Sequence, residues 1–342
     1  MRAVVIDTPH NVTVRDVPDP KVGPRDALIR VRATGICGTD LHIIDGEFPI
    51  ATYPNIPGHE LAGEIVELGS EIGDVEKGVV DFKVGDRVGI DPTLNCGECF
   101  FCHRGQSNLC ERFGAVGLTY PGGFAEYTSV PIRTLYKLPD DMSFATGALI
   151  EPVCCAVRGF HRLSPQVGET YLIYGAGPMG LINAQMARFN GASQVAMIDI
   201  NESRLKRAKD DFGVEHVATS LDELRDLAPR GFDNVIEATG VTRVASMAMD
   251  AVIRGGKLLL FGVCPPGQKA EYEAYRIYNQ EITIMGTMAV RNSYGPALDI
   301  LATRRIDSDK MVTHTLPLDR FEEAVEIARK GSGIKVQVAP NG

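Results

Sequence analysis

The chain has 342 residues, which is long enough for a large buried core and favours two domains over one. Hydrophobic residues make up 44% and charged residues 23%, a composition typical of a globular protein and not of a disordered chain. The formal net charge of -9 disfavours nucleic acid and anionic membranes as partners, because an acidic surface repels phosphate groups.

The N-terminal residues contain no apolar stretch of signal-peptide length, and no uncharged apolar run is long enough to cross a bilayer. We therefore expect a cytoplasmic protein that has neither nucleic acid nor a membrane as a partner. In a reducing compartment the 8 cysteines are not expected to form disulfides. Clustered cysteines in such a protein point to metal binding or catalysis instead.

Up to residue 150 the sequence predicts an irregular, mostly β domain. Short β-rich runs broken by Gly and Pro follow one another, without a long amphipathic helix between them. The predicted strands of this part are 28–33, 61–68, 87–90 and 125–130.

Beyond residue 150, strand-like and helix-like segments alternate, which predicts βαβ units and a doubly wound parallel sheet. The predicted strands are 170–174, 195–200, 234–238, 257–263 and 282–285, with helices at 179–189 and 202–212. The tail predicts a helix at 294–302, a strand at 312–316, a helix at 321–329 and a final strand at 334–338. We expect domains at 1–150 and 151–290, with 291–342 returning to the first domain.

A glycine-rich turn with the spacing G-x-G-x-x-G extends from Gly175 through Gly177, Pro178 and Met179 to Gly180. It follows an apolar predicted strand and opens a predicted helix, which is the context that a dinucleotide site requires. The first glycine permits a tight turn, the second the close approach of a pyrophosphate, and the third the packing of helix on strand. Unpaired N–H groups at the start of the helix would bind the phosphates. The alternative is a purely structural turn.

Asp199 ends the next predicted strand, at about the ~20-residue offset expected of the acid that binds the adenosine ribose. A carboxylate there repels a 2′-phosphate, so NAD is favoured over NADP. Arg204, on the predicted helix that follows, is a further cofactor-binding candidate. The alternative for Asp199 is a helix-capping residue.

Four cysteines, Cys96, Cys99, Cys102 and Cys110, have the spacing C-x2-C-x2-C-x7-C in a glycine-containing loop. Four thiolates brought so close together fit a closed tetrahedral zinc site of structural type. Disulfides, a zinc ribbon that contacts nucleic acid and an iron–sulfur cluster are the alternatives. The acidic charge balance disfavours the ribbon.

Three further segments carry metal-binding residue types but lie far apart in the sequence: Cys37, the pair His59-Glu60, and Glu151. Each has a simple structural interpretation, as a buried cysteine, a surface histidine or a helix-capping glutamate. Spacing alone cannot join them, so their convergence on one metal stays open at this point.

In this order, the motifs resemble the zinc-containing branch of the medium-chain dehydrogenase/reductase family, over nearly the whole chain. The matching segments are 35–40, 58–63, 82–88, the four-cysteine loop, 122–127 and the glycine-rich turn. The resemblance implies an α/β protein, in which a GroES-like, mostly β catalytic domain is combined with a Rossmann domain.

By this resemblance, Cys37, His59 and Glu151 are ligands of a catalytic zinc, and Glu60 is an alternative ligand. One position then stays open for water or substrate, as catalysis on zinc requires. Asp40 resembles the carboxylate that orients the zinc-binding imidazole of His59. Together with the four-cysteine site, two zincs per chain are implied.

The resemblance also implies a reaction, the oxidation of a secondary alcohol with hydride transfer to NAD. Thr39 would pass the alcohol proton, by way of the cofactor ribose, to His42 at the surface. As structural alternatives, Thr39 caps a helix and His42 is an ordinary exposed histidine.

A glutamate rather than a second cysteine at position 151, and an aromatic content of 7% without Trp, predict a polar cleft. Polyols, sugar alcohols or cyclitols fit such a cleft, and a 3-hydroxy amino acid such as L-threonine is the alternative. A non-catalytic binding or structural homologue would lack Cys37 or His59, and a zinc-free NADPH-dependent enone reductase would lack the four-cysteine loop.

Two further expectations concern assembly and one loop. The apolar segment 281–285 and the resemblance predict a homo-oligomer, a tetramer or else a dimer, joined through the edge of the Rossmann sheet. The segment 70–80 is longer than the corresponding link in the family and is predicted to be a solvated loop.

Overall fold

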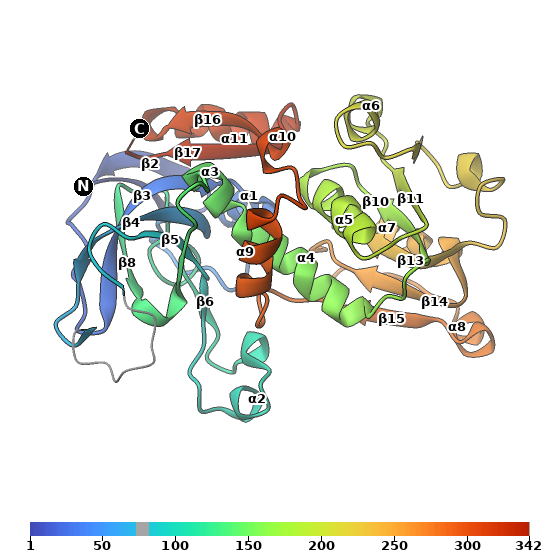
Figure 1. The fold of residues 1–342 in the computed structure, drawn as a ribbon, viewed down its shortest axis with the longest axis horizontal. Helices are drawn as coiled ribbons and strands as arrows, with labels where there is room; N and C mark the ends of the chain where they lie inside the picture. Colours follow the sequence, from blue (N-terminus) through green and yellow to red (C-terminus); the bar gives the residue numbers. More distant parts are fainter. Residues whose placement is uncertain (73–81, 342) are drawn as a thin grey trace. The chain divides into compact units, whose positions relative to one another are not determined.

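The computed structural model describes residues 1–72 and 82–341, which form two compact units (Figure 1). The first unit consists of Met1–Glu151, Val290–Thr303 and Ser308–Gly342, and the second of Pro152–Ala289 and Arg304–Asp307. The short segment 304–307, which we expected in the first domain, thus belongs to the second unit. Most of the predicted long loop at 70–80 lies outside the described residues.

The first unit is built on a seven-stranded sheet with the order β16-β17-β3-β4-β5-β9, in which β8 also pairs with β3. All its pairs are antiparallel except β16 with β17. Its strands are β3 (Asp26–Gly35), β4 (Glu60–Leu68), β5 (Arg87–Ile90), β8 (Tyr127–Pro131), β9 (Leu135–Lys137), β16 (Val312–Pro317) and β17 (Lys335–Ala339). The tail pairs with the first unit through its last strand, because β17 lies beside β3 in the sheet.

The remaining elements of the first unit are short. Two small sheets join β1 to β2 and β6 to β7. Their strands are β1 (Arg2–Thr8), β2 (Asn11–Asp16), β6 (Thr93–Leu94) and β7 (Gly114–Ala115). The helices are α1 (Gly38–Asp45), α2 (Phe100–His103), α3 (Phe144–Ala148), α9 (Tyr294–Ala302), α10 (Ser308–Met311) and α11 (Phe321–Lys330).

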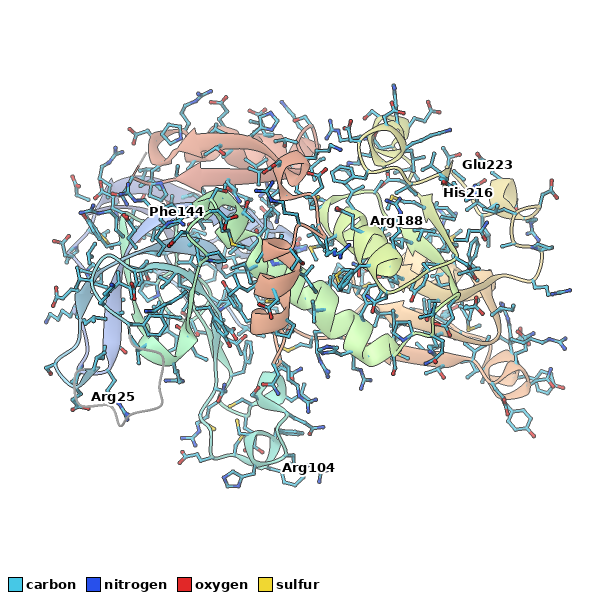
Figure 2. The ribbon with its side chains drawn as sticks, viewed as in Figure 1. Arg25, Arg104, Phe144, Arg188, His216 and Glu223 are labelled. Atoms are coloured by element: carbon cyan, nitrogen blue, oxygen red, sulfur yellow. The ribbon has the colours of Figure 1, made fainter. Side chains whose placement is uncertain are left out.

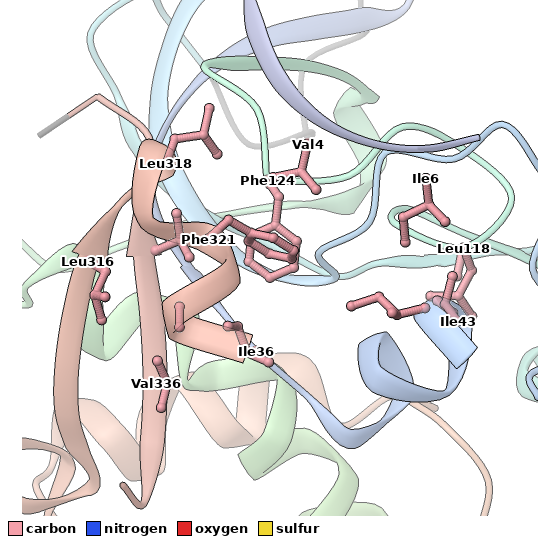
Figure 3. Close-up of a cluster of buried hydrophobic side chains, with 14 residues drawn as sticks. Val4, Ile6, Ile36, Ile43, Leu118, Phe124, Leu316, Leu318, Phe321 and Val336 are labelled. Carbon is pink, nitrogen blue, oxygen red and sulfur yellow. The ribbon is translucent and has the colours of Figure 1, made fainter. Parts of the chain in front are cut away.

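One hydrophobic cluster holds the tail against the N-terminal part of the chain (Figure 3). The rings of Phe124 and Phe321 meet edge to face, with centroids 4.9 Å apart, and both side chains are fully buried. Val4 of β1 and Val336 of β17 belong to the same cluster. Burial of aromatic side chains of this size contributes several kcal/mol in all, at ~25 cal/mol per Å² of apolar surface. The tail is thus part of the core of the first unit.

The second unit contains a six-stranded parallel sheet with the order β12-β11-β10-β13-β14-β15. Its strands are β10 (Thr170–Tyr174), β11 (Gln194–Ile198), β12 (His216–Ala218), β13 (Phe232–Glu237), β14 (Val252–Leu260) and β15 (Thr283–Gly286). Counted along the chain this is the order 3-2-1-4-5-6 of dinucleotide-binding sheets. The predicted doubly wound sheet is confirmed.

Helices connect these strands, as parallel pairing requires. They are α5 (Pro178–Phe189), α6 (Glu202–Asp210), α7 (Thr242–Ala248) and α8 (Ala274–Gln280), and a further helix, α4 (Ile150–Leu163), precedes β10. The strand β10 is apolar from Tyr171 to Tyr174, and all four residues are buried because both faces of a parallel sheet are covered. Two predicted strand ends were wrong. β11 ends before Asp199, and β14 begins at Val252, where a register shift against β13 obscures the sequence pattern.

β15 is the edge strand of this sheet, the place that we expected for the segment 281–285. Assembly through this edge stays a prediction. None of the helices in the described ranges combines the length and the apolar character that a membrane span needs.

Candidate functional site

A group of three potential metal ligands lies at one end of the β3–β4 pair in the first unit. Cys37 lies two residues after the end of β3, and His59 directly precedes Glu60, the first residue of β4. Because Gly35 pairs with Glu60 in the antiparallel register, the end of one strand meets the start of the other. The ligand atoms of Cys37, His59 and Glu60 all lie within 4.8 Å of one another. The pairing therefore brings together residue types that spacing alone could not join.

Asp40 fixes the two segments that carry these ligands. Its carboxylate is fully buried and accepts the backbone N–H of Cys37 at 2.8 Å and that of Gly58 at 3.2 Å. One carboxylate oxygen also lies 3.6 Å from Nδ1 of His59, an electrostatic contact that is longer than a hydrogen bond. This is the place of a carboxylate that orients a metal-binding imidazole.

The buried imidazole of His59 is in a negatively charged environment. Burial by itself would lower the pKa of His59, but Asp40 and Cys37 raise that pKa well above its ordinary value. The same anions that favour a protonated imidazole would favour a metal cation. The donor set of thiolate, imidazole and carboxylate is that of a catalytic zinc site.

The other predicted residues of this site lie at different distances from the group. Glu151 is buried in the first turn of α4, and among the described residues it is not one of those whose ligand atoms meet within 4.8 Å. Thr39 Oγ1 lies 3.7 Å from Cys37 Sγ. His42 is partly exposed on α1, and its Nδ1 lies 2.9 Å from Oε2 of Glu47. Since Cys37 caps α1, Thr39 is not the capping residue.

Sequence reasoning missed Lys335. Its Nζ lies 2.7 Å from Oε1 of Glu60, and the two side chains are 3% and 1% exposed. In the predicted strand 334–338, Lys335 and Gln337 alternate with apolar residues, a pattern typical of ordinary solvent-facing positions.

The four-cysteine lobe brings its sulfurs together as predicted. Cys96 Sγ lies 3.5 Å from that of Cys110 and 4.0 Å from that of Cys102, and the sulfurs of Cys99 and Cys110 are 3.9 Å apart. Four sulfurs at ~2.3 Å from a tetrahedral zinc would be about 3.8 Å from one another. These distances exclude disulfide bonds and fit one metal ion.

Backbone N–H groups prepare the lobe for a cation. The pKa of the Cys96 thiol is lowered to about 6, first because the N–H of Glu98 donates to it. The pKa of Cys99 is also lowered, chiefly by the N–H groups of Glu111 and Cys102. Both shifts favour thiolate, the form that binds metal, whereas burial and the neighbouring Cys99 raise the pKa of Cys102 to about 12.

The lobe has little hydrophobic core of its own. No residue of α2 is buried, and Phe100 is 60% exposed, with the guanidinium of Arg104 lying 5.2 Å from its ring centroid (Figure 2). Closure of the lobe at its base depends on the β6–β7 pair. The fold of the lobe therefore depends on its four thiols rather than on packing.

In the second unit, the glycine-rich turn connects β10 to α5. Gly175 has a φ of +101°, which only glycine adopts without strain, and Gly177 caps the helix, with Pro178 in its first turn. A side chain at Gly180 would overlap the carbonyl oxygen of Gly175. At Gly177 a Cβ atom would meet nothing within 4 Å. The turn thus leaves open backbone at the start of a 12-residue helix, with Met179 in its first turn.

Asp199 lies directly against this turn. Its Oδ2 accepts the N–H of Ala176 at 2.7 Å, and its Oδ1 accepts that of Asn201 at 2.8 Å. Arg204 Nη1 lies 4.0 Å from the same carboxylate. The side chain of Asn201 caps α6, so Asp199 is not its capping residue.

Comparison with known proteins finds similarity over nearly the whole chain. The family model of the alcohol dehydrogenase GroES-like domain matches residues 23–140, and that of the zinc-binding dehydrogenases matches residues 178–303. D-arabinitol dehydrogenase 1 of Uromyces fabae is 35% identical over 349 residues, which cover 100% of this chain and 97% of that protein. D-altritol 5-dehydrogenase of Agrobacterium fabrum is 37% identical over 324 residues, covering 94% of this chain and 91% of that protein.

One further relative is named for a different substrate, and one similar solved structure is described with NADP bound. L-threonine 3-dehydrogenase of Mesorhizobium japonicum is 32% identical over 342 residues, which cover 95% of this chain and 94% of that protein. A structure from Sinorhizobium meliloti 1021, described as a zinc-binding dehydrogenase bound to NADP, superimposes with a TM-score of 0.92. It is 33% identical and covers 99% of each chain.

Substitutions of Gly177 and Gly180 should distinguish a glycine that is needed for cofactor binding from one that is needed for folding. We expect Gly180→Ala to lower the free energy of unfolding by about 1–3 kcal/mol, because the added methyl group overlaps backbone. Gly177→Ala should leave thermal unfolding unchanged and weaken NADH binding about tenfold or more, since its methyl group points into open space. Thermal unfolding and NADH fluorescence titration measure both. Parent-like NADH affinity in Gly177→Ala would contradict the assignment.

The lobe should hold one zinc per chain until the protein unfolds, while a second, catalytic zinc is removed by a chelator together with activity. Metal analysis of Cys99→Ser should find about one zinc fewer per chain and a lower unfolding temperature, because the lobe has no core to replace the metal. Cys264→Ser, which alters a thiol outside both clusters, is the control. A full zinc content in Cys99→Ser would show that the lobe binds no metal.

Proposed function

Because the chain belongs to the zinc-binding alcohol dehydrogenases with a GroES-like domain, we propose that it oxidises a secondary alcohol of a polyol or a similar polar substrate. The product is a ketone, and NAD accepts the hydride. The chain is an enzyme whose cofactors are zinc and a nicotinamide dinucleotide. The observation that carries the proposal is the group of Cys37, His59 and Glu60, whose ligand atoms lie within 4.8 Å of one another.

In the proposed mechanism, Cys37, His59 and a carboxylate hold the catalytic zinc. When bound, zinc supplies Lewis-acid chemistry and lowers the pKa of an alcohol at the site. Asp40 keeps the imidazole of His59 in its orientation. Exclusion of water is supported by the burial of His59, Glu60 and Glu151.

The proton of the alcohol needs a path to solvent. Thr39, close to Cys37, is the proposed first acceptor, and His42 is the proposed last. His42 suits this role because its side chain is 37% exposed and because Glu47 lies in contact with the imidazole.

The substrate class is proposed from two sources. The relatives named for D-arabinitol and D-altritol act on polyols by their names, and the site contains buried carboxylates that suit polar groups. The second candidate, a 3-hydroxy amino acid, is favoured by the relative named L-threonine 3-dehydrogenase.

A substrate panel tests the function. Pentitols, hexitols, cyclitols, simple secondary alcohols and L-threonine are each incubated with enzyme and NAD, and NADH absorbance is followed. We expect turnover with one or more polyols and little with simple alcohols. Turnover of L-threonine alone would replace the polyol proposal, and no turnover of any alcohol would refute both.

Cofactor choice should depend on Asp199. We expect kcat/KM to be at least tenfold higher with NAD than with NADP, about 1.4 kcal/mol or more, because the carboxylate repels a 2′-phosphate. Asp199→Ala should narrow this ratio, while Asp226→Ala, an exposed acid elsewhere in the unit, should leave it unchanged. Equal kcat/KM values with the two cofactors in the parent enzyme would contradict the prediction.

The two glutamates should differ in their effect on the metal. We expect Glu151→Ala to lower zinc occupancy and to reduce kcat/KM by more than ~100-fold, as for a lost electrostatic contact in the transition state. Glu60→Ala should do less, because Glu60 is proposed as a reserve ligand. Zinc analysis and kinetics of both variants show which glutamate is the principal zinc ligand. Loss of the metal in Glu60→Ala and its retention in Glu151→Ala would exchange the two roles.

A further inference from the structure

Lys335 is a buried cation at the candidate catalytic metal site that has no role in the mechanism above. Its side chain is 3% exposed, and lysines are rarely buried unless they are paired. The ammonium donates to Oε1 of Glu60 at 2.7 Å and to the carbonyl of Ile36 at 3.2 Å. It thus contacts both segments that carry the proposed ligands, one residue before Cys37 and one after His59.

The strand pairing fixes this position. β17 pairs with β3 so that Gln337 lies opposite Gly35, and the N–H of Ile36 donates to the carbonyl of Val336 at 2.9 Å. Ile36 and Val336 lie on these neighbouring segments in Figure 3. Lys335, which precedes Val336 and begins β17, is therefore held beside the segment that leads into Cys37.

Three acidic groups surround the ammonium. Burial lowers the pKa of Lys335, but Glu60, Cys37 and Glu151 together raise it above its ordinary value. The contact with Glu60 places the ammonium beside the proposed ligand set, and Glu151 is close enough to act on it electrostatically.

Glu60 has little freedom between its neighbours. Its Oε1 is paired with Lys335, and its Oε2 lies so close to Gly35 that any side chain there would overlap it. Ligand atoms of Cys37 and His59 are nevertheless within 4.8 Å of the Glu60 carboxylate. The Glu60 carboxylate is therefore within reach of a metal that these two residues hold.

We propose that Lys335 is a positioning residue that holds Glu60 away from the catalytic zinc, so that Glu151 supplies the carboxylate ligand and one coordination position stays open for substrate. The inference rests on the proposed function, since it requires a zinc held by Cys37 and His59.

A balance of charges explains why the cation is needed. A zinc ion with one thiolate and one carboxylate is neutral overall. Asp40 beside His59 adds one buried negative charge, and the carboxylate of Glu60 adds a further one. Lys335 neutralises that charge without occupying the metal. Without Lys335, Glu60 would be a buried anion beside a dication, and binding the zinc would be its only compensation.

The test is a double-mutant cycle on the zinc-loaded enzyme, using Lys335→Met, Glu60→Gln and the double variant. Zinc affinity is measured by competition with a chelator, and coordination by the absorption spectrum after cobalt replaces the catalytic zinc. We expect Lys335→Met to raise zinc affinity about tenfold or more, to change the cobalt spectrum and to lower kcat, because Glu60 fills the open position. Lys335→Arg, which keeps the charge, should restore most of the parent behaviour.

The Glu60→Gln variant distinguishes an effect of Lys335 through Glu60 from simple charge repulsion between Lys335 and the metal. If Lys335 acts through Glu60, adding Lys335→Met to Glu60→Gln should leave the cobalt spectrum unchanged and raise zinc affinity much less. An equal gain in both backgrounds would mean simple charge repulsion and would overturn the proposal, as would a Lys335→Met enzyme with the parent's zinc affinity and spectrum. Should Lys335→Met not fold, Lys335→Gln, which keeps a donor for Glu60, gives the same comparison. A parent enzyme without a zinc outside the lobe would instead refute the proposed function.

Discussion

The register of β3 with its two neighbours is the constraint on which the first unit depends. Gly35, near the end of β3, pairs with Glu60 of β4 on one side and with Gln337 of β17 on the other. Three segments that are far apart in the sequence therefore meet at one point, and they supply Cys37, the His59-Glu60 pair and Lys335. A shift of one residue in either pairing would turn these side chains to the opposite face of the sheet.

The two candidate metal sites differ in how the chain stabilises several negatively charged ligands close together. In the lobe, the four thiols come from one short loop, and backbone N–H groups lower the pKa of Cys96 and Cys99. That loop has almost no core, so a metal would replace packing. The other group is buried in a sheet, where charged side chains, Asp40 and Lys335, orient and balance the ligands. The first arrangement suits a closed site, and the second suits one that must leave a position open.

Local patterns in the sequence predicted much of this structure. The predicted strands 87–90 and 170–174 and the predicted helix 294–302 have the bounds found in β5, β10 and α9. The glycine-rich turn and the four-cysteine loop were also visible, because the residues that act together are close in the sequence. α4 was missed, although Glu151 and Pro152 in its first turn are residues typical of a helix start.

Contacts between distant residues could not be predicted in this way. Lys335 and Glu60 are separated by 275 positions, and neither has a neighbour in the sequence that marks it as buried or paired. The place of Glu60 close to Cys37 and His59 likewise follows from strand register, which short apolar strands leave undetermined in the sequence.

The distance in sequence between Glu60 and Lys335 links the ion pair to the completion of the core of the first unit. A buried carboxylate without its partner is strongly destabilising, and the partner of Glu60 belongs to the last strand of the chain. The same strand contributes Val336 to the cluster around Phe124 and Phe321. Its pairing therefore completes both the charge compensation of Glu60 and the apolar packing. The pairing of β17 with β3 must close a loop that includes the whole second unit, which costs chain entropy before any contact is formed. The ligand-bearing ends of β3 and β4 therefore reach their final electrostatic environment only when the tail has joined the sheet.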